Sequence, residues 1–190
     1  MTAWIFIVVF LLVLWLAFAY NRLVRARNMV REAWSGIDVQ LKRRAELIPN
    51  LIEVVKGYSR YERSLLEDIT RARSAAIAGE GVAQRATAEG SLSEGLRRIF
   101  AVAENYPDLQ ANRQFLELQK NLVDVEDQIQ YARRYYNGTV RDLNIRVESF
   151  PSLIPARIFG FPTAEYFELE SATERVNPQV RSQSEVRSQK

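Results

Sequence analysis

The first 21 residues carry no charged side chain, and this feature constrains the fold more than any other. Residues 4–20 read WIFIVVFLLVLWLAFAY, an apolar run with aromatic residues at both ends. A helix needs about 20 apolar residues to cross a bilayer, and aromatic side chains concentrate at the two membrane surfaces. We therefore expect residues 1–21 to form a transmembrane anchor.

A cleaved signal peptide is the competing interpretation, because Ala17-Phe18-Ala19 has the form of a cleavage site. However, no basic residue precedes Trp4, and the apolar run is longer than the core of a typical signal peptide. Both features favour an anchor that remains attached.

The first charged residues after the apolar run are arginines: Arg22, Arg25, Arg27 and Arg31. Basic residues that flank a membrane span remain in the cytoplasm. We therefore expect a single-pass protein of the inner membrane, with its amino terminus outside and a cytoplasmic domain over residues 22–170.

The composition excludes most common enzyme chemistry. The chain has no cysteine and no histidine, so it lacks disulfides, thiolate nucleophiles, imidazole bases and His or Cys metal ligands. Glu117 and Asp124 could share one helical face, but they lie beside an apolar seam and no Glu-x-x-His motif accompanies them. The net charge of +3 comes from interleaved basic and acidic residues, which is typical of solvated helix faces rather than of a nucleic-acid surface. We expect no enzyme activity, no cofactor, no metal and no nucleic-acid partner.

Apolar residues spaced three and four apart predict an all-α fold. The expected helices cover residues 22–46, 50–78, 82–105 and 108–137, and the last of them has the clearest apolar seam. Gly79 and Gly81 supply the connection between the second helix and the third. After the transmembrane helix, we therefore expect an antiparallel up-down four-helix bundle.

Pro49 raises the question of whether the chain bends or reverses. The apolar stripe keeps its phase across Pro49, which favours one kinked helix. The lengths favour a turn, because the four segments would measure roughly 37, 43, 36 and 45 Å at 1.5 Å per residue. A joined first rod of roughly 85 Å would leave the fourth helix with an exposed seam. We therefore expect a reversal at residues 47–50, at the tip of the bundle.

The sequence changes character after Ser149. Residues 150–168 read FPSLIPARIFGFPTAEYFE, where three prolines forbid a long helix while the apolar content requires burial. We expect an irregular C-terminal arm that lies against the bundle or the membrane interface. Residues 171–190 are polar, and we expect a disordered tail there.

Two groups of residues are candidate binding sites. The first is a surface for an unknown protein partner at the expected tip, and solvated helix ends with Arg-carboxylate pairs are its alternative. The second is a lipid-facing group that combines juxtamembrane arginines with aromatic residues of the arm. The first group is Lys42, Arg43, Arg44, Pro49, Asn50 and Lys56, and the second is Arg22, Arg25, Arg27, Phe159 and Phe161.

Several motifs are spread over nearly the whole chain except the polar tail. They are Tyr20-Asn21-x-Leu23-Val24, Ala33-Trp34-x-x-Ile37-Asp38-Val39-Gln40-Leu41-Lys42-Arg43-Arg44, Leu47-Ile48-Pro49-Asn50-Leu51 with Val55-Lys56-Gly57-Tyr58, Ala132-Arg133-Arg134-Tyr135-Tyr136-Asn137, and Phe159-Gly160-Phe161 before Tyr166-Phe167. Together they resemble the LemA family of bacterial proteins. The resemblance implies one amino-terminal membrane helix and a cytoplasmic antiparallel helical bundle, and it carries over no catalytic residue.

Two functions follow as hypotheses. The first is a membrane-anchored, non-enzymatic scaffold or adaptor that contacts membrane lipids through its anchor and one or more proteins through its bundle. This agrees with the resemblance, which implies roles in organising the membrane or its protein assemblies. The second is a module that binds anionic membrane surfaces through the lipid-facing group.

Overall fold

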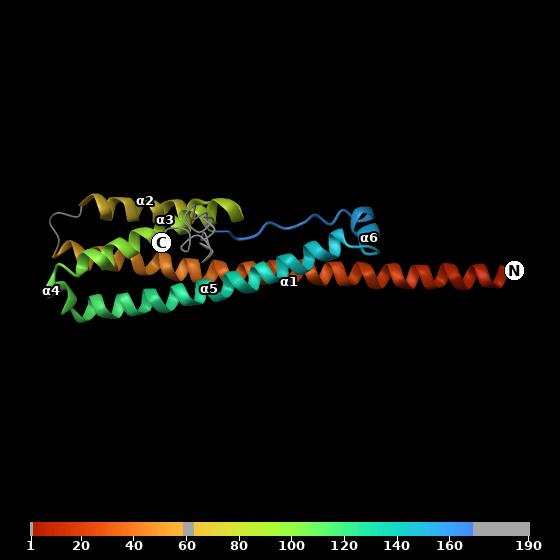
Figure 1. Ribbon diagram of the computed structural model, residues 1–190, viewed down its shortest axis with the longest axis horizontal. Helices are drawn as coiled ribbons and strands as arrows, with labels where there is room; N and C mark the ends of the chain where they lie inside the picture. Colours follow the sequence, from red (N-terminus) through yellow and green to blue (C-terminus); the bar gives the residue numbers. More distant parts are fainter. Residues whose placement is uncertain (1, 59–62, 169–190) are drawn as a thin grey trace, which may run out of the picture.

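The computed structural model describes residues 2–58 and 63–168, and all regular secondary structure in these ranges is helical. The longest element is α1 (Thr2–Lys56), whose amino-terminal part extends well beyond the other helices (Figure 1). The most apolar 18-residue window of α1 has a mean hydropathy of 2.3, and only 6% of it is buried. A core helix of a soluble protein would be covered, so α1 has the length and the bare apolar surface of a membrane span.

Four antiparallel segments form the bundle, which confirms the predicted fold class. The distal part of α1 is followed by α2 (Arg63–Ala78), α3 (Val82–Ala103), the short α4 (Pro107–Gln110) and α5 (Arg113–Glu148). Successive long helices run in opposite directions (Figure 1). α1 packs chiefly against α5, and α2 packs chiefly against α3. The bundle is therefore the long α1–α5 pair with the shorter α2–α3 hairpin on its distal half, the half farther from the amino terminus (Figure 1).

The reversal predicted at residues 47–50 is wrong, because α1 continues through Pro49 to Lys56. A proline inside a helix has no N–H for the carbonyl four residues earlier, here that of Ala45. The side chain of Arg73, on α2, replaces this donor: its Nε donates to the Ala45 carbonyl oxygen at 2.7 Å. The tertiary contact satisfies the acceptor that Pro49 leaves open, so the helix needs no turn there.

The bundle helices are unequal in length, so a continuous α1 does not leave the seam of the last helix exposed. α2 has 16 residues and α3 has 22, whereas α5 has 36 and continues past Gly138 to Glu148. The predicted helix over 108–137 is divided: α4 is separate, and the Asn112 side chain caps α5 by accepting from the backbone N–H groups of Gln114 and Phe115. The hairpin covers only the distal part of the α1–α5 seam, and another segment covers the proximal part.

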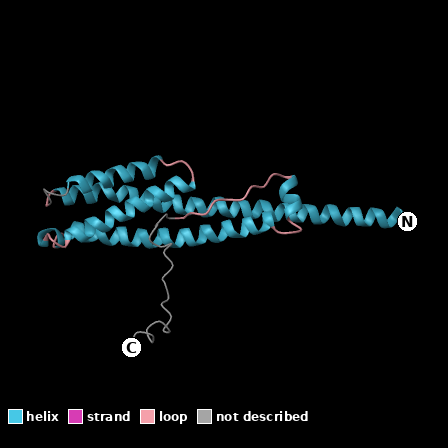
Figure 2. Cartoon of the chain, turned by 45° about the horizontal axis from the view of Figure 1, so that its top comes forward, coloured by secondary structure: helices cyan, strands magenta, loops and turns pink. Residues whose placement is uncertain are grey.

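That segment is the C-terminal arm, which consists of α6 (Leu153–Ile158) and an extended stretch up to residue 168. It returns along α1 and α5 towards the middle of the bundle (Figure 2). Asn144 exchanges two hydrogen bonds with the backbone of Ala164, at 2.8 and 3.0 Å, and Asn137 does the same with Phe167, at 2.9 and 3.2 Å. Each side-chain amide thus satisfies the backbone N–H and carbonyl of one arm residue, and the two asparagines, seven residues apart on α5, fix the arm to that helix. The predicted tail, 171–190, lies outside the described residues.

Candidate membrane-interface site

The arm begins level with the end of the apolar run of α1. The Tyr20 ring, which closes that run, lies 4.8 Å from the ring of Phe159 and 5.7 Å from that of Phe161, both edge to face. Aromatic residues favour the boundary between lipid and water. This end of the bundle is therefore the part of the soluble domain that would meet the membrane surface.

An exposed apolar group surrounds this end, and we name it the apolar collar. Phe150 is 80% exposed and Ile158 is 66% exposed. Neither residue belongs to the apolar run of α1. Singly exposed apolar residues are ordinary, but a cluster of large ones indicates an interaction surface. The collar consists of Phe150, Ile154, Ile158 and Phe159.

Phe161 does not belong to the collar, so the expectation that it faces lipid is wrong. Its side chain is only 7% exposed, and the Arg27 guanidinium lies 5.1 Å from its ring centroid. Gly160 adopts φ +65, and the Phe161 N–H donates to the Ala156 carbonyl at 2.9 Å, a left-handed glycine cap on α6. The cap turns the chain inward, which leaves Phe159 outside and places Phe161 and Arg27 against each other.

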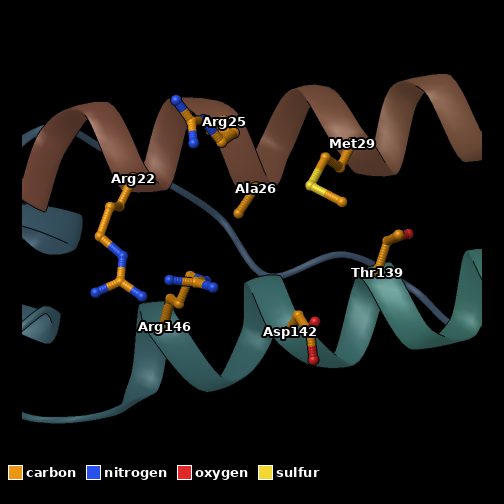
Figure 3. Close-up of a pocket in the computed structure, with 7 residues that line it drawn as sticks. All are labelled: Arg22, Arg25, Ala26, Met29, Thr139, Asp142 and Arg146. Carbon is orange, nitrogen blue, oxygen red and sulfur yellow. The ribbon is translucent and has the colours of Figure 1, made fainter.

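Arginines from two helices line a small cavity of ≈ 180 Å³ at the same level, and we name it the arginine cleft. Arg22 and Arg25 come from α1, and Arg146 comes from α5, close to its carboxyl end (Figure 3). Ala26 forms part of the α1 wall, and Asp142 is the one acidic residue in the lining. Like charges gathered in a cleft repel one another, so this arrangement favours an anionic ligand or an anionic surface.

The residues of the predicted docking group do not form one surface in the structure, since five are exposed along α1 and one is buried. Lys42 and Arg43 are exposed on α1, and Lys42 forms an ion pair with Asp38 at 2.6 Å. Pro49, Asn50 and Lys56 are also exposed. Because α1 does not end at Pro49, Lys42 lies mid-helix, about 21 Å before Lys56 at 1.5 Å per residue, and not at the tip.

Arg44 is buried, so the expectation that it is displayed to a partner is wrong. Its side chain is 3% exposed, and its Nη1 lies 3.2 Å from Glu89 Oε2. Its Nη2 donates to Ser93 Oγ at 2.8 Å and lies 3.0 Å from Glu126 Oε2. Arg44 thus joins α1 to α3 and α5, and its role in the fold is structural.

Two carboxyl groups at the contacts between α1 and α3 have pKa values shifted in opposite directions. Burial raises the pKa of Glu89 above its ordinary value, and the neighbouring charge of Glu126 adds to the rise, while Arg44 opposes it. The second charged contact between α1 and α3 joins Asp38 to Arg85, and there the pKa shift has the opposite sign. Hydrogen bonding to Lys42, and also to Arg85, lowers the pKa of Asp38 despite the opposing effect of burial.

Sequence reasoning did not single out Arg146 or Ile154. Arg146 is more than 100 positions from Arg22 in the chain, and only the packing of α5 along α1 brings the two into one cleft. A signal was nevertheless present, because Arg146 follows Leu143 by three residues, and Leu143 lies on the predicted seam. A basic residue beside the apolar seam, near the end of the last predicted helix, was therefore a candidate for the membrane-proximal site.

These features define a class of protein: an all-helical bundle behind an apolar helix that is long enough to cross a membrane. The LemA family model matches residues 33–181, and the chain belongs to the LemA family. The magnetosome protein MamQ of Magnetospirillum gryphiswaldense is 25% identical over 85% of this chain and 70% of its own length. MamQ 2 of Paramagnetospirillum magneticum is 26% identical with the same coverage. Protein LemA of Metamycoplasma hominis is 28% identical over 68% of this chain and 60% of its own length.

Proposed function

We propose that this protein is a single-pass, non-enzymatic scaffold of the inner membrane that holds a helical docking surface at a set height in the cytoplasm. The observation that carries the proposal is the continuity of α1, which runs without interruption from the apolar segment to Lys56. From Tyr20 to Lys56 this helix projects about 54 Å at 1.5 Å per residue. A rigid connection between span and bundle suits a spacer or adaptor.

The chemistry of the chain supports binding rather than catalysis. It has no histidine or cysteine to act as base or nucleophile. In the described ranges, the acidic side chains form no group of three or more that could hold a metal ion. The buried charges around Arg44 are engaged with one another, as expected of a structural cluster.

The best-supported docking surface is the exposed side of α1 together with the groove that it forms with α2. The groove encloses ≈ 710 Å³, and Ile52 and Leu66 provide its apolar floor. Lys56 lies at one side of it and has no ion pair within the described ranges. We propose that a partner protein places an apolar segment with acidic flanks in this groove, and that Lys42, which lies on the same side of α1 as Lys56, contacts the same partner.

Site-directed photo-crosslinking in native membranes tests this function. A photoreactive residue in place of Lys42 or Lys56 is expected to yield the same crosslinked product. The product should be lost when Leu66→Glu alters the groove floor. Position 131 on α5, where Tyr131 is 62% exposed, serves as the matched control and should yield no such product. Capture from position 131 but not from 42 and 56 would place the partner elsewhere and refute the docking surface.

The proposed orientation has a separate test. A reporter enzyme that is active only outside the cytoplasm, fused after Lys190, should be silent. A strong signal from that fusion would reverse the topology, since it would place the bundle outside.

A second function, a module that acts on anionic membrane surfaces, is favoured by the apolar collar beside the juxtamembrane arginines. We expect residues 150–160 of the full chain to exchange amide hydrogens more slowly in nanodiscs with anionic lipid than in zwitterionic nanodiscs. The double variant Phe150→Ser, Phe159→Ser should remove the difference. Equal exchange in both lipids would exclude this second function.

A further inference from the structure

We propose that the arginine cleft and an adjoining apolar groove together bind one anionic phospholipid, with its phosphate among Arg22, Arg25 and Arg146 and one acyl chain in the groove. The inference rests on the proposed anchoring of α1 in a membrane, and it adds a defined ligand site that a scaffold does not require. Four observations carry it: a shared lining, unpaired positive charge, a buried donor without an acceptor, and the position of the site along α1.

The groove adjoins the cleft, and its wall on α1 beyond Arg22 is formed by apolar side chains. It encloses ≈ 340 Å³ between the end of the apolar run of α1 and the α5–α6 connection. Arg22 and Arg146 line both the cleft and the groove, so the two cavities meet at these guanidinium groups. The other groove residues on α1 are Trp15, Phe18, Ala19 and Leu23, and those on the opposite side are Ile145, Ser149, Pro151 and Ser152. A ligand that occupies both cavities must be charged at one end and apolar at the other.

The cleft contains positive charge that the protein does not neutralise. In the described part of the chain, Arg22, Arg25 and Arg146 form no ion pair, whereas most arginines of α2 and α3 do. The acidic residue in the lining, Asp142, is exposed and lies 3.9 Å from Arg141 Nε. The lining thus contains three guanidinium groups and one carboxylate, and each guanidinium group can donate two parallel hydrogen bonds to phosphate oxygens.

Arg146 supplies a more specific indication. Its Nε is buried and has no hydrogen-bond partner in the described structure. Buried donors are nearly always satisfied. Although the Nε atoms of Arg27 and Arg44 also have no partner within the described residues, Arg146 is the one whose side chain lines both the cleft and the groove, where a phosphate would supply the acceptor. Figure 3 shows Arg22 and Arg146, on facing helices, extending into the space between α1 and α5, where a phosphate would accept from both.

The position along α1 identifies the phosphate as that of a lipid. Arg22 follows the last residue of the apolar run, Tyr20, by two positions, which is the level of the headgroups if the run spans the bilayer. The apolar wall of the groove, at Trp15 and Phe18, then lies at the depth of the acyl chains. A soluble phosphate would leave this wall empty, whereas a phospholipid has the same order of polarity along its length. The exposed Asp142 can accept a hydrogen bond from a headgroup hydroxyl.

The binding experiment uses the full chain, purified in a non-ionic detergent. The probe is dioctanoyl phosphatidylglycerol, and native mass spectrometry with thermophoresis measures stoichiometry and affinity. We expect saturable binding of one lipid per chain. Dioctanoyl phosphatidylcholine tests the headgroup charge, and glycerol 3-phosphate tests the acyl chain; each should bind at least tenfold more weakly.

Matched variants locate the site. Arg146→Gln should weaken binding of the lipid at least tenfold. Arg157→Gln removes the same charge from α6, at the same end of the molecule but outside both cavities, and should change affinity less than twofold. Ile145→Trp keeps the charge but fills the groove, and should also weaken lipid binding. If Arg146→Gln loses helicity by circular dichroism, the double variant Arg22→Gln, Arg25→Gln, at two exposed positions, decides the question.

Three results would overturn the proposal. Equal losses in Arg146→Gln and Arg157→Gln would mean diffuse attraction to anionic surfaces, and equal affinity for glycerol 3-phosphate would mean a simple phosphate site. Absence of saturable binding would mean that the two cavities do not form a lipid site. Carbonate extraction of native membranes separates this outcome from failure of the anchor, since an anchored chain stays in the pellet whether or not it binds the lipid.

Discussion

The continuity of α1 through Pro49 depends on a contact made 28 residues away, and a double-mutant cycle can test this dependence. Arg73→Met keeps most of the side-chain length but removes the donor to the Ala45 carbonyl. Hydrogen bonds to charged groups contribute about 1.5–3 kcal/mol, and an unsatisfied partly buried acceptor costs a similar amount. For a chain of 150–250 residues this corresponds to a fall in Tm of about 3–12 °C.

The second arm of the cycle is Pro49→Ala. Alanine restores the backbone N–H to the Ala45 carbonyl, and it removes a helix-interior proline whose cost is about 3 kcal/mol when nothing compensates for it. Arg73 already compensates in part, so Pro49→Ala should stabilise the chain by less than this. In the Pro49→Ala background, Arg73→Met should cost under about 0.5 kcal/mol, which gives a coupling energy of about 1–2.5 kcal/mol.

Circular dichroism at the helical band, followed during heating of the full chain in detergent micelles, measures the four Tm values. Arg71→Met is the matched control, since Arg71 lies two residues earlier on α2 and is 77% exposed in an ion pair with Asp68. Exposed pairs contribute at most about 1 kcal/mol. If Arg73→Met lowers Tm equally with Pro49 and with Ala at position 49, the carbonyl contact does not explain the continuous helix.

Three further predictions concern the helices of the bundle. The raised pKa of Glu89 means that the folded protein keeps this proton at pH values where the unfolded chain, with an ordinary pKa of 4.5, has lost it. Stability should therefore fall as pH rises from 4.5 through the folded pKa, and Glu89→Gln should flatten this part of a Tm–pH profile; an unchanged slope would contradict the assignment. Gly95→Ala should destabilise the α2–α3 hairpin by about 1–3 kcal/mol, because the added Cβ would lie 2.7 Å from Ile69 Cγ1. Gly138→Ala meets no neighbouring atom within 4 Å and should stabilise α5 by about 0.5–1 kcal/mol in the same assay.

Much of the fold was predictable because it depends on local properties. The seam of α5 followed from apolar spacing, and Phe115, Val125 and Val140 are buried on it as predicted. The third helix was predicted over 82–105 and ends at Ala103. The first reversal was misplaced because its position depends on which helices pack together. A length comparison assumed equal rods, whereas the arm, held by Asn137 and Asn144, covers the proximal half of the long pair.

In the candidate sites too, some features follow from local sequence and others depend on packing. The prediction of juxtamembrane arginines needed only the boundary of the apolar run, but Arg146 joins them through packing alone. Arg44 is identical in type to its neighbour Arg43, and helical phase alone did not reveal that three helices meet around it. Phe159 and Phe161 are two residues apart, and the left-handed Gly160 between them sends one outward and the other inward.

The sequence by itself determined the properties that depend on composition and periodicity: an apolar helix of membrane-spanning length, an all-helical domain and the absence of imidazole and thiol chemistry. The tertiary structure decided everything that depends on a distant partner. The carbonyl that Pro49 leaves open in α1 accepts from Arg73, a donor 28 residues away that only packing brings within reach. Whether a basic residue is displayed or buried likewise depends on which carboxylates packing brings to it, as Lys42 and Arg44 demonstrate on one helix.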